Sequence, residues 1–200
     1  MIPNAVDTKR FTPDPSARRP LNTINIVIMS RLCYRKGTDL LLDVIPPIAS
    51  LFPEVYFIIG GDGPKKILLE EIKEKYNLHD RMELLGSVPH SEVRNVLVRG
   101  HIFLNTSLTE AFCIAIVEAA SCGLQVVSTA VGGVVEVLPS NMIRMAAPEP
   151  QSIIEALSAT IPEVRNITSH TFHEQISTCY DWHLVADRTE VVYESLEGRR

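Results

Sequence analysis

Short runs of apolar, often β-branched residues alternate with longer amphipathic stretches along most of this 200-residue sequence. Such runs are typical of strands buried on both faces of a parallel sheet, and the stretches between them have helical spacing. The predicted strands cover residues 24–29, 55–59, 82–85, 101–105, 126–128 and 142–145. The predicted helices cover residues 39–50, 64–76, 91–98 and 111–122, and the pattern is helical from residue 150 onward. The sequence therefore predicts an α/β fold with a doubly wound, Rossmann-like parallel sheet.

The loops that follow the strands are where functional residues are expected, because ligands of doubly wound sheets bind beyond the carboxyl ends of the strands. These loops cover residues 30–37, 60–64, 86–90, 105–110 and 129–133. The first twenty residues contain four prolines and are predicted to be irregular.

Composition argues against a nucleic-acid-binding protein, a disulfide-rich secreted protein and a membrane-spanning chain. A net charge of −5 gives no electrostatic basis for binding nucleic acid. The four cysteines have no metal-binding or disulfide-scaffold spacing, and the first residues lack the pattern of a signal peptide, so we expect reduced, intracellular thiols. The apolar stretch 111–138 is interrupted by glutamates and glycines, which favours a buried helix and strand over a membrane span.

The first loop contains cations that suit an anionic ligand. Arg31 and Lys36 lie between a strand end and a helix start, where backbone N–H groups also favour an anion. Solvated surface cations are an equally good interpretation of this spacing. The sequence contains neither a P-loop motif nor a G-x-G-x-x-G motif after the first strand, which argues against a P-loop NTPase and a dinucleotide dehydrogenase.

Two glycine-rich turns follow other strands. Glycine lets a backbone approach a ligand closely, but it also simply forms turns, and this holds for both turns at 60–63 and 132–133. For Asp62, a turn role is favoured over metal binding because no second carboxylate is near in the sequence. His170 and His173 form an isolated H-x-x-H pair that is not part of a recognisable zinc-binding pattern, so a surface role is favoured for them.

Glu110 and Glu118 are the strongest candidates for chemistry. On one continuous helix they would lie about 12 Å apart. Residues 107–110 (SLTE) also fit a capping box, which would give Glu110 a structural role. Glu118 stands among apolar residues and needs a hydrogen-bonding partner, which a ribose diol or an arginine would supply.

In combination these segments resemble the second domain of retaining GT-B glycosyltransferases that carry an E-x7-E motif. The resemblance covers roughly residues 1–140. The matching segments occur in the same order as in the family and are residues 3–7 and 11–13, Arg31 and 36–37, 61–64, 107–112 continuing to 118–119, and 132–136. Residues 31–37, 93–105, 105–113 and 117–129 are similar to the subfamily of phosphatidylinositol N-acetylglucosaminyltransferase catalytic subunits. Most of the wider family has glycine at the position of Cys113.

The resemblance implies transfer of N-acetylglucosamine from UDP-GlcNAc to phosphatidylinositol, the first step of GPI-anchor synthesis. It implies no metal cofactor, and a place in a multi-subunit membrane complex at the cytoplasmic face of the endoplasmic reticulum. The expected catalytic residues are Arg31 and Lys36, which neutralise the leaving diphosphate, and Glu110, which positions the sugar rather than acting as a nucleophile. Glu118 is expected to hold the ribose. The expected donor-binding set is completed by Gly61, Gly63, Gly86, Val88, Ala111, Phe112, Gly132 and Gly133, with the backbone at 86–88 meeting the uracil.

The resemblance also divides the chain. Residues 1–22 are expected to lead in from a missing N-terminal domain, 23–162 to form the nucleotide-sugar-binding domain, and 163–200 to form helices that pack back on the missing domain. The acceptor-binding half and the membrane anchor would then lie outside this sequence, and the chain alone would bind donor without catalysis. Alternatives are a related transferase with another donor or acceptor, a non-catalytic nucleotide-sugar-binding module, and an interaction domain without a working pocket.

Overall fold

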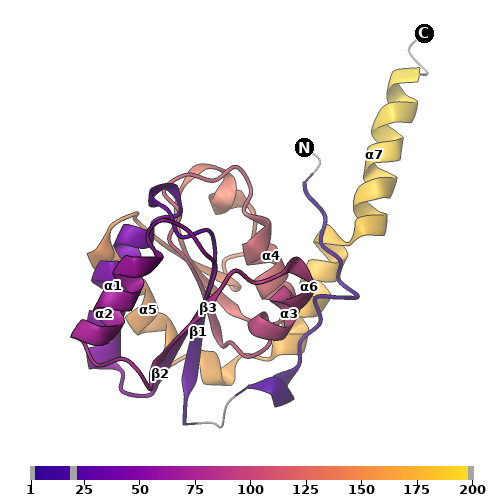
Figure 1. Cartoon of the computed structure of the whole chain (residues 1–200). Helices are drawn as coiled ribbons and strands as arrows, with labels where there is room; N and C mark the ends of the chain where they lie inside the picture. The colour runs from indigo at the N-terminus through magenta and orange to yellow at the C-terminus, as the bar shows by residue number, and fades with distance from the viewer. Residues whose placement is uncertain (1–2, 19–21, 198–200) are drawn as a thin grey trace.

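The fold is described from a computed structural model, which covers residues 3–18 and 22–197. Residues 1–2, 19–21 and 198–200 of the predicted terminal segments lie outside the described residues. One six-stranded sheet has the order β3-β2-β1-β4-β5-β6, and every neighbouring pair is parallel (Figure 1). The strands are β1 (Ile24–Met29), β2 (Val55–Gly60), β3 (Met82–Gly86), β4 (Ile102–Asn105), β5 (Gln125–Thr129) and β6 (Ile143–Ala146). The predicted doubly wound sheet is confirmed.

Helices cover both faces of the sheet (Figure 1). They are α1 (Thr38–Leu51), α2 (Lys66–Lys75), α3 (His90–Leu97), α4 (Ile114–Ser121), α5 (Pro150–Thr160), α6 (Ser169–Tyr180) and α7 (Trp182–Glu197). Short 3-10 helices are η1 (Pro15–Ala17), η2 (Tyr34–Lys36), η3 (Gly132–Glu136) and η4 (Val164–Asn166). Ile26 packs in the core beneath α1, α2 and α5, whereas its neighbour Val27 packs in the core beneath α3, α4 and α6. Strands with both faces buried in this way are mostly apolar, which is the pattern seen in the sequence.

Two predicted helix starts are wrong. The helix expected at 64–76 begins at Lys66, after a turn. The helix expected at 111–122 begins at Ile114, because Cys113 has a left-handed backbone with φ of 61°. The stretch 111–138 contains α4 and β5 rather than a membrane span, as predicted. No helix among the described residues is long and apolar enough to cross a membrane.

The first described residues run along the outside of the α3–α4–α6 layer. Val6 forms a parallel bridge with Asp181 and donates its backbone N–H to the Tyr180 carbonyl at 2.8 Å. Phe11 is 2% exposed and belongs to the same core as α4 and α6. The Ser121 hydroxyl donates to the Phe11 carbonyl at 2.7 Å. This segment is therefore held on the domain by residues from α4 and from the end of α6.

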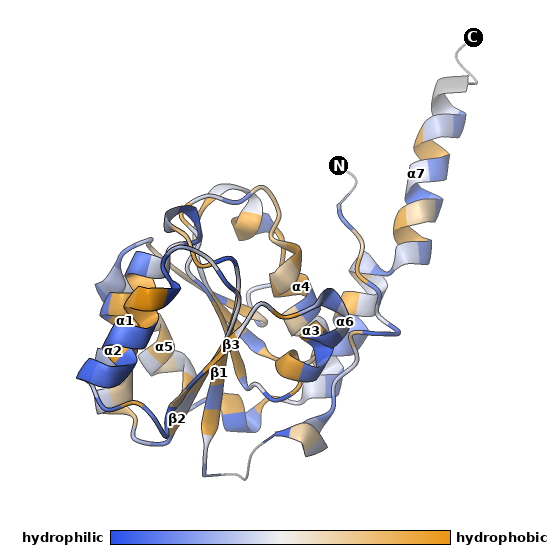
Figure 2. Cartoon of the chain, viewed as in Figure 1, coloured by the Kyte–Doolittle hydropathy of each residue, from blue (hydrophilic) through white to orange (hydrophobic). Residues whose placement is uncertain are grey.

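The two last helices differ in their surroundings. α6 packs on α4 through the buried side chains of Phe172 and Ile176. His173 Nδ1 lies 2.9 Å from the Ser121 carbonyl oxygen, which accepts, and 3.2 Å from Ser121 Oγ. His173 is therefore half-buried between two helices, whereas the sequence favoured a surface position. α7 projects away from the sheet, and apolar residues recur along it (Figures 1 and 2). Trp182, its first residue, is 59% exposed. Packing of residues 163–200 on another domain stays a prediction. Within this chain, α6 already contributes Phe172 and Ile176 to the core on the α3–α4 side of the sheet.

Candidate functional site

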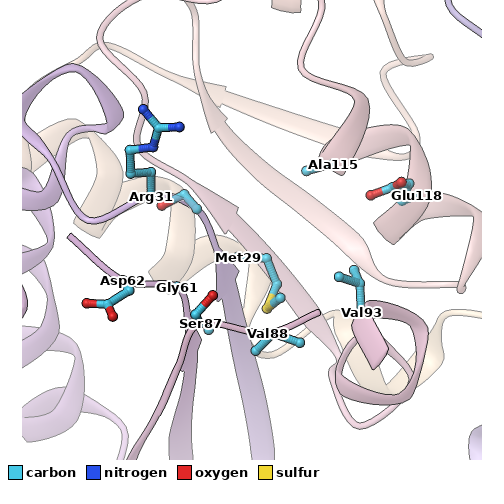
Figure 3. Close-up of a pocket in the computed structure, with 11 residues that line it drawn as sticks. Met29, Arg31, Gly61, Asp62, Ser87, Val88, Val93, Ala115 and Glu118 are labelled. Atoms are coloured by element: carbon cyan, nitrogen blue, oxygen red, sulfur yellow. The ribbon is translucent and has the colours of Figure 1, made fainter. Parts of the chain in front are cut away.

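A pocket of about 320 Å³ opens at the carboxyl ends of β1, β2 and β3 and faces α4. It lies where the strand order reverses between β1 and β4, the position at which doubly wound sheets bind ligands. Four of the predicted site residues line it: Arg31, Gly61, Val88 and Glu118. Figure 3 shows Arg31 and Asp62 on one side of this pocket and Ala115 and Glu118 on the other. The apolar side chains of Met29 and Val93, which the sequence did not single out, complete the wall.

Arg31 is exposed and lies two residues after the end of β1. A second, adjoining hollow is lined by Arg31, Cys33, Arg35 and Lys36. The cations of the loop therefore gather where two hollows meet, as the prediction of an anion site requires. Gly37 closes η2 with φ of 68°, and a Cβ there would lie 1.8 Å from the Thr106 carbonyl oxygen. Only glycine allows the cationic loop to lie this close to the loop that follows β4.

Lys36 and Glu110 form an ion pair between these two loops. Their side chains are 26% and 12% exposed, so both are partly withdrawn from solvent. Ser107 Oγ donates to the same carboxylate oxygen at 2.9 Å. The capping box predicted at 107–110 is wrong, because no helix begins there and Ser107 bonds the Glu110 side chain instead of a helical N–H. The 12 Å spacing along one helix does not apply either, since α4 contains Glu118 alone.

Glu118 is 7% exposed and lies on the face of α4 that lines the pocket. Burial raises the pKa of its carboxyl group above 4.5, and hydrogen bonding and charge interaction with His90 oppose that shift. The partner is His90, with Nε2 3.3 Å from Glu118 Oε1, and not the arginine that the sequence left open. The sequence analysis did not identify His90 as a site residue, although His90 ends the 86–90 loop, one of the loops where functional residues were expected.

The predicted glycines have contacts inside the protein. A Cβ on Gly61 would lie 1.8 Å from the Ser30 carbonyl oxygen, and one on Gly63 would lie 2.4 Å from that of Leu32. Both glycines thus let the β2 loop pack on the β1 loop, and Gly63 does not line the pocket. Gly86 differs, because a Cβ there would meet no atom within 4 Å. The open space beside Gly86 is compatible with the uracil contact predicted for 86–88.

A separate hollow of about 520 Å³ gathers the remaining predicted residues, Ala111, Phe112, Gly132 and Gly133, together with Tyr180. Gly133 N–H donates to the Glu110 carbonyl at 3.2 Å, and Cβ atoms on Gly132 and Gly133 would lie 2.0 Å from the carbonyl oxygens of Glu110 and Ala111. The predicted set is therefore divided among three hollows: the pocket at the strand ends, the adjoining hollow with Lys36, and this separate one.

Asp62 has the predicted turn role. Its Oδ1 accepts a hydrogen bond from the Gly63 N–H at 2.7 Å. Within residues 3–18 and 22–197, no group of three or more histidine, cysteine or acidic side chains is arranged to hold a metal ion.

Comparison with known proteins gives the family. Residues 12–167 match the model of the glycosyl transferases group 1. The chain is 56% identical to subunits of phosphatidylinositol N-acetylglucosaminyltransferase from Arabidopsis thaliana and from Homo sapiens, over 97% of the chain in both cases. It covers 43% and 40% of these two proteins, less than half of their length.

Solved structures agree with this fold. Sucrose-phosphate synthase from Thermosynechococcus elongatus superposes with a TM-score of 0.83 at 22% identity, over 100% of this chain and 53% of that one. Anabaena HepE in complex with UDP-glucose superposes with a TM-score of 0.77 at 22% identity, over 97% of this chain and 56% of that one. With its sheet order, its site at the strand ends and the family model that spans most of its length, this chain belongs to the group 1 glycosyl transferases.

Proposed function

We propose that this chain is the donor-binding half of a retaining transferase that moves N-acetylglucosamine from UDP-GlcNAc to phosphatidylinositol, the first step of GPI-anchor synthesis. The observation that carries this proposal is the 56% identity over 97% of the chain to two transferase subunits of that name. The pocket at the sheet's switch point supports it, because it brings a cation and a buried carboxylate to opposite sides of one space.

Arg31 and Lys36 are assigned to the diphosphate. In a retaining transfer the sugar becomes oxocarbenium-like while negative charge grows on the leaving diphosphate, and fixed positive charge stabilises that state. The hollow that Arg31 shares with Arg35 and Lys36 supplies such charge from the protein itself. No metal is assigned to this step.

The two glutamates are assigned to the ends of the donor. Glu118, on the pocket side of α4, accepts hydrogen bonds from the ribose hydroxyl groups. Glu110 accepts from hydroxyl groups of the sugar, and its pair with Lys36 puts the sugar contact next to the diphosphate contact. The uracil lies against the backbone at residues 86–88, beside the open space at Gly86.

The complete reaction requires more than this chain. Because the chain covers only 40–43% of the two relatives, the phosphatidylinositol acceptor is assigned to a facing domain beyond it. By the same reasoning, assembly with other subunits and location at the cytoplasmic face of the endoplasmic reticulum are proposed for the whole transferase. The chain alone is expected to bind donor without transferring sugar.

Calorimetric titration with UDP, UDP-GlcNAc and a GDP-sugar tests the proposal. We expect saturable binding of the two uridine ligands and weaker binding of the GDP-sugar. Glu118→Ala and Lys36→Met should each weaken UDP-GlcNAc binding by about 1–3 kcal/mol, the scale of a hydrogen bond to a charged group. Lys73→Met, on α2 and away from the pocket, is the matched control. Equal binding of UDP-GlcNAc by wild type and all variants would show that the donor site does not lie in these loops. Equal affinity for the GDP-sugar and the uridine ligands would contradict the assignment of a uridine donor.

A further inference from the structure

Glu118 is the last member of a chain of three side chains that come from distant parts of the sequence. Arg10 Nη1 lies 3.2 Å from His90 Nδ1, and Arg10 Nη2 donates to the His90 carbonyl oxygen at 2.5 Å. His90 Nε2 lies 3.3 Å from Glu118 Oε1. The ring of His90 also packs edge-on against Phe11, with 5.9 Å between ring centroids. The imidazole is therefore held from two directions by the segment that precedes η1.

The contact with Arg10 determines which ring nitrogen of His90 carries the proton. A guanidinium group has only donors, so the Nδ1 atom facing it must accept and cannot be protonated. The proton then sits on Nε2, the nitrogen that faces Glu118. His90 consequently donates to Glu118 Oε1, and Arg10 sets the direction of that hydrogen bond.

This donation leaves the second carboxylate oxygen of Glu118 available. Among the described residues, Oε2 has no hydrogen-bond partner, while the residue lines the pocket. A glutamate side chain has three rotatable bonds, and holding one oxygen reduces the number of orientations that the other can take. Binding then requires less ordering of Glu118 by the ligand.

We propose that Arg10 and His90 are positioning residues, which orient Glu118 so that Oε2 faces the ribose hydroxyl groups of a uridine diphosphate donor. This inference rests on the proposed function, in which Glu118 holds the ribose. It assigns the segment before η1 to the donor site, although that segment contributes no residue to the pocket wall described above.

The effect of His90 on folding must be separated from its effect on binding. The side chain of His90 is 67% exposed, but that of Glu118 is only 10% exposed, so removing the donor leaves a buried carboxylate without its partner. His90→Phe should therefore lower the unfolding temperature as well as weaken binding, and a binding loss that depends on the ribose hydroxyl groups distinguishes positioning from a general loss of structure.

The test compares UDP with 2′,3′-dideoxyuridine 5′-diphosphate, which lacks the hydroxyl groups that Glu118 would bind. His90→Phe keeps a ring against Phe11 and removes the donor, and it should weaken UDP binding about 3- to 10-fold. His90→Gln returns an N–H donor near the position of Nε2 and should restore the affinity to within about twofold of the wild-type value. The dideoxy ligand should bind equally to all three proteins. A loss that is the same for both ligands, or absent for both, would overturn the positioning role.

A second measurement needs no ligand. Nitrogen-15 NMR of the histidine rings should show His90 as the Nε2–H tautomer, and Arg10→Met should give a mixture of tautomers. An Nδ1–H ring in the wild-type protein would overturn the inference whatever the affinities are.

The variant Glu118→Ala separates the two proposals. If it leaves UDP binding unchanged, or if the wild-type chain binds no UDP, the proposed function fails and the role of His90 fails with it. If Glu118→Ala weakens binding and His90→Phe does not, the donor site stands and only the positioning role is lost.

Discussion

The side chains of Lys36 and Glu110, 74 positions apart in the sequence, form an ion pair that joins the loop after β1 to the loop after β4. In the absence of ligand, each residue neutralises the other. A diphosphate that approaches Lys36 must therefore share this cation with Glu110, and a sugar that approaches Glu110 must share the carboxylate with Lys36. The pair links the two ends of the proposed donor electrostatically.

Glu110→Gln should consequently affect the binding of UDP and of UDP-GlcNAc differently. Release of Lys36 should tighten binding of UDP by about two- to fivefold, the scale of a partly exposed ion pair. UDP-GlcNAc should lose affinity relative to UDP, because the sugar contact is weakened. Calorimetry with both ligands measures the two effects. Weaker binding of UDP by Glu110→Gln would show that the carboxylate supports Lys36 instead of competing for it.

Glu118→Gln should stabilise the ligand-free protein at pH 7. Because burial raises the pKa of Glu118 above 4.5, the folded state takes up a proton at a higher pH than the unfolded state does. The wild-type protein therefore gains stability from this group as the pH falls through the folded pKa toward 4.5. The difference in unfolding temperature between Glu118→Gln and wild type should be positive at pH 7 and should shrink over that interval. A difference that does not change with pH would contradict this account.

Gly132→Ala should be more destabilising than Gly86→Ala. Both glycines have left-handed backbones, with φ of 52° and 69°, so alanine costs each about 1 kcal/mol in conformation. Only at Gly132 would the new Cβ meet another atom, the Glu110 carbonyl oxygen at 2.0 Å. We expect about 1–3 kcal/mol of further destabilisation there, as for overpacking. Urea unfolding of both variants gives the comparison, and equal losses would mean that the Glu110 loop moves freely.

The cysteines should differ in reactivity. Burial raises the pKa values of Cys113 and Cys122 to about 12, so both remain thiols at pH 8, whereas Cys179 is exposed. The thiolate is the reactive form, and iodoacetamide should therefore modify Cys179 well before Cys113 or Cys122. Peptide mass spectrometry after timed labelling measures this order, with the urea-unfolded chain as the control. Modification of Cys113 as fast as that of Cys179 would show that the start of α4 opens readily.

Local sequence determined the sheet and most of the helices. The strand β1 was predicted with its observed bounds, and the other strands to within one residue at each end, because runs buried on both faces are rich in apolar, β-branched residues. The position of Arg31 at the crevice followed from the same pattern, since the ends of parallel strands meet at one edge. The place of Glu118 beside this crevice was implied by the family resemblance and not by the pattern.

Tertiary structure decided what each of these side chains contacts. The left-handed backbone at Cys113 delays α4 and separates Glu110 from the helix that carries Glu118. The pairing of Lys36 with Glu110 and of His90 with Glu118, and the close approach that requires Gly132, each join segments more than twenty residues apart. Hydrophobic periodicity reports which face of an element is buried, whereas hydrogen bonds and ion pairs depend on which loops the folded sheet brings within about 3 Å of each other.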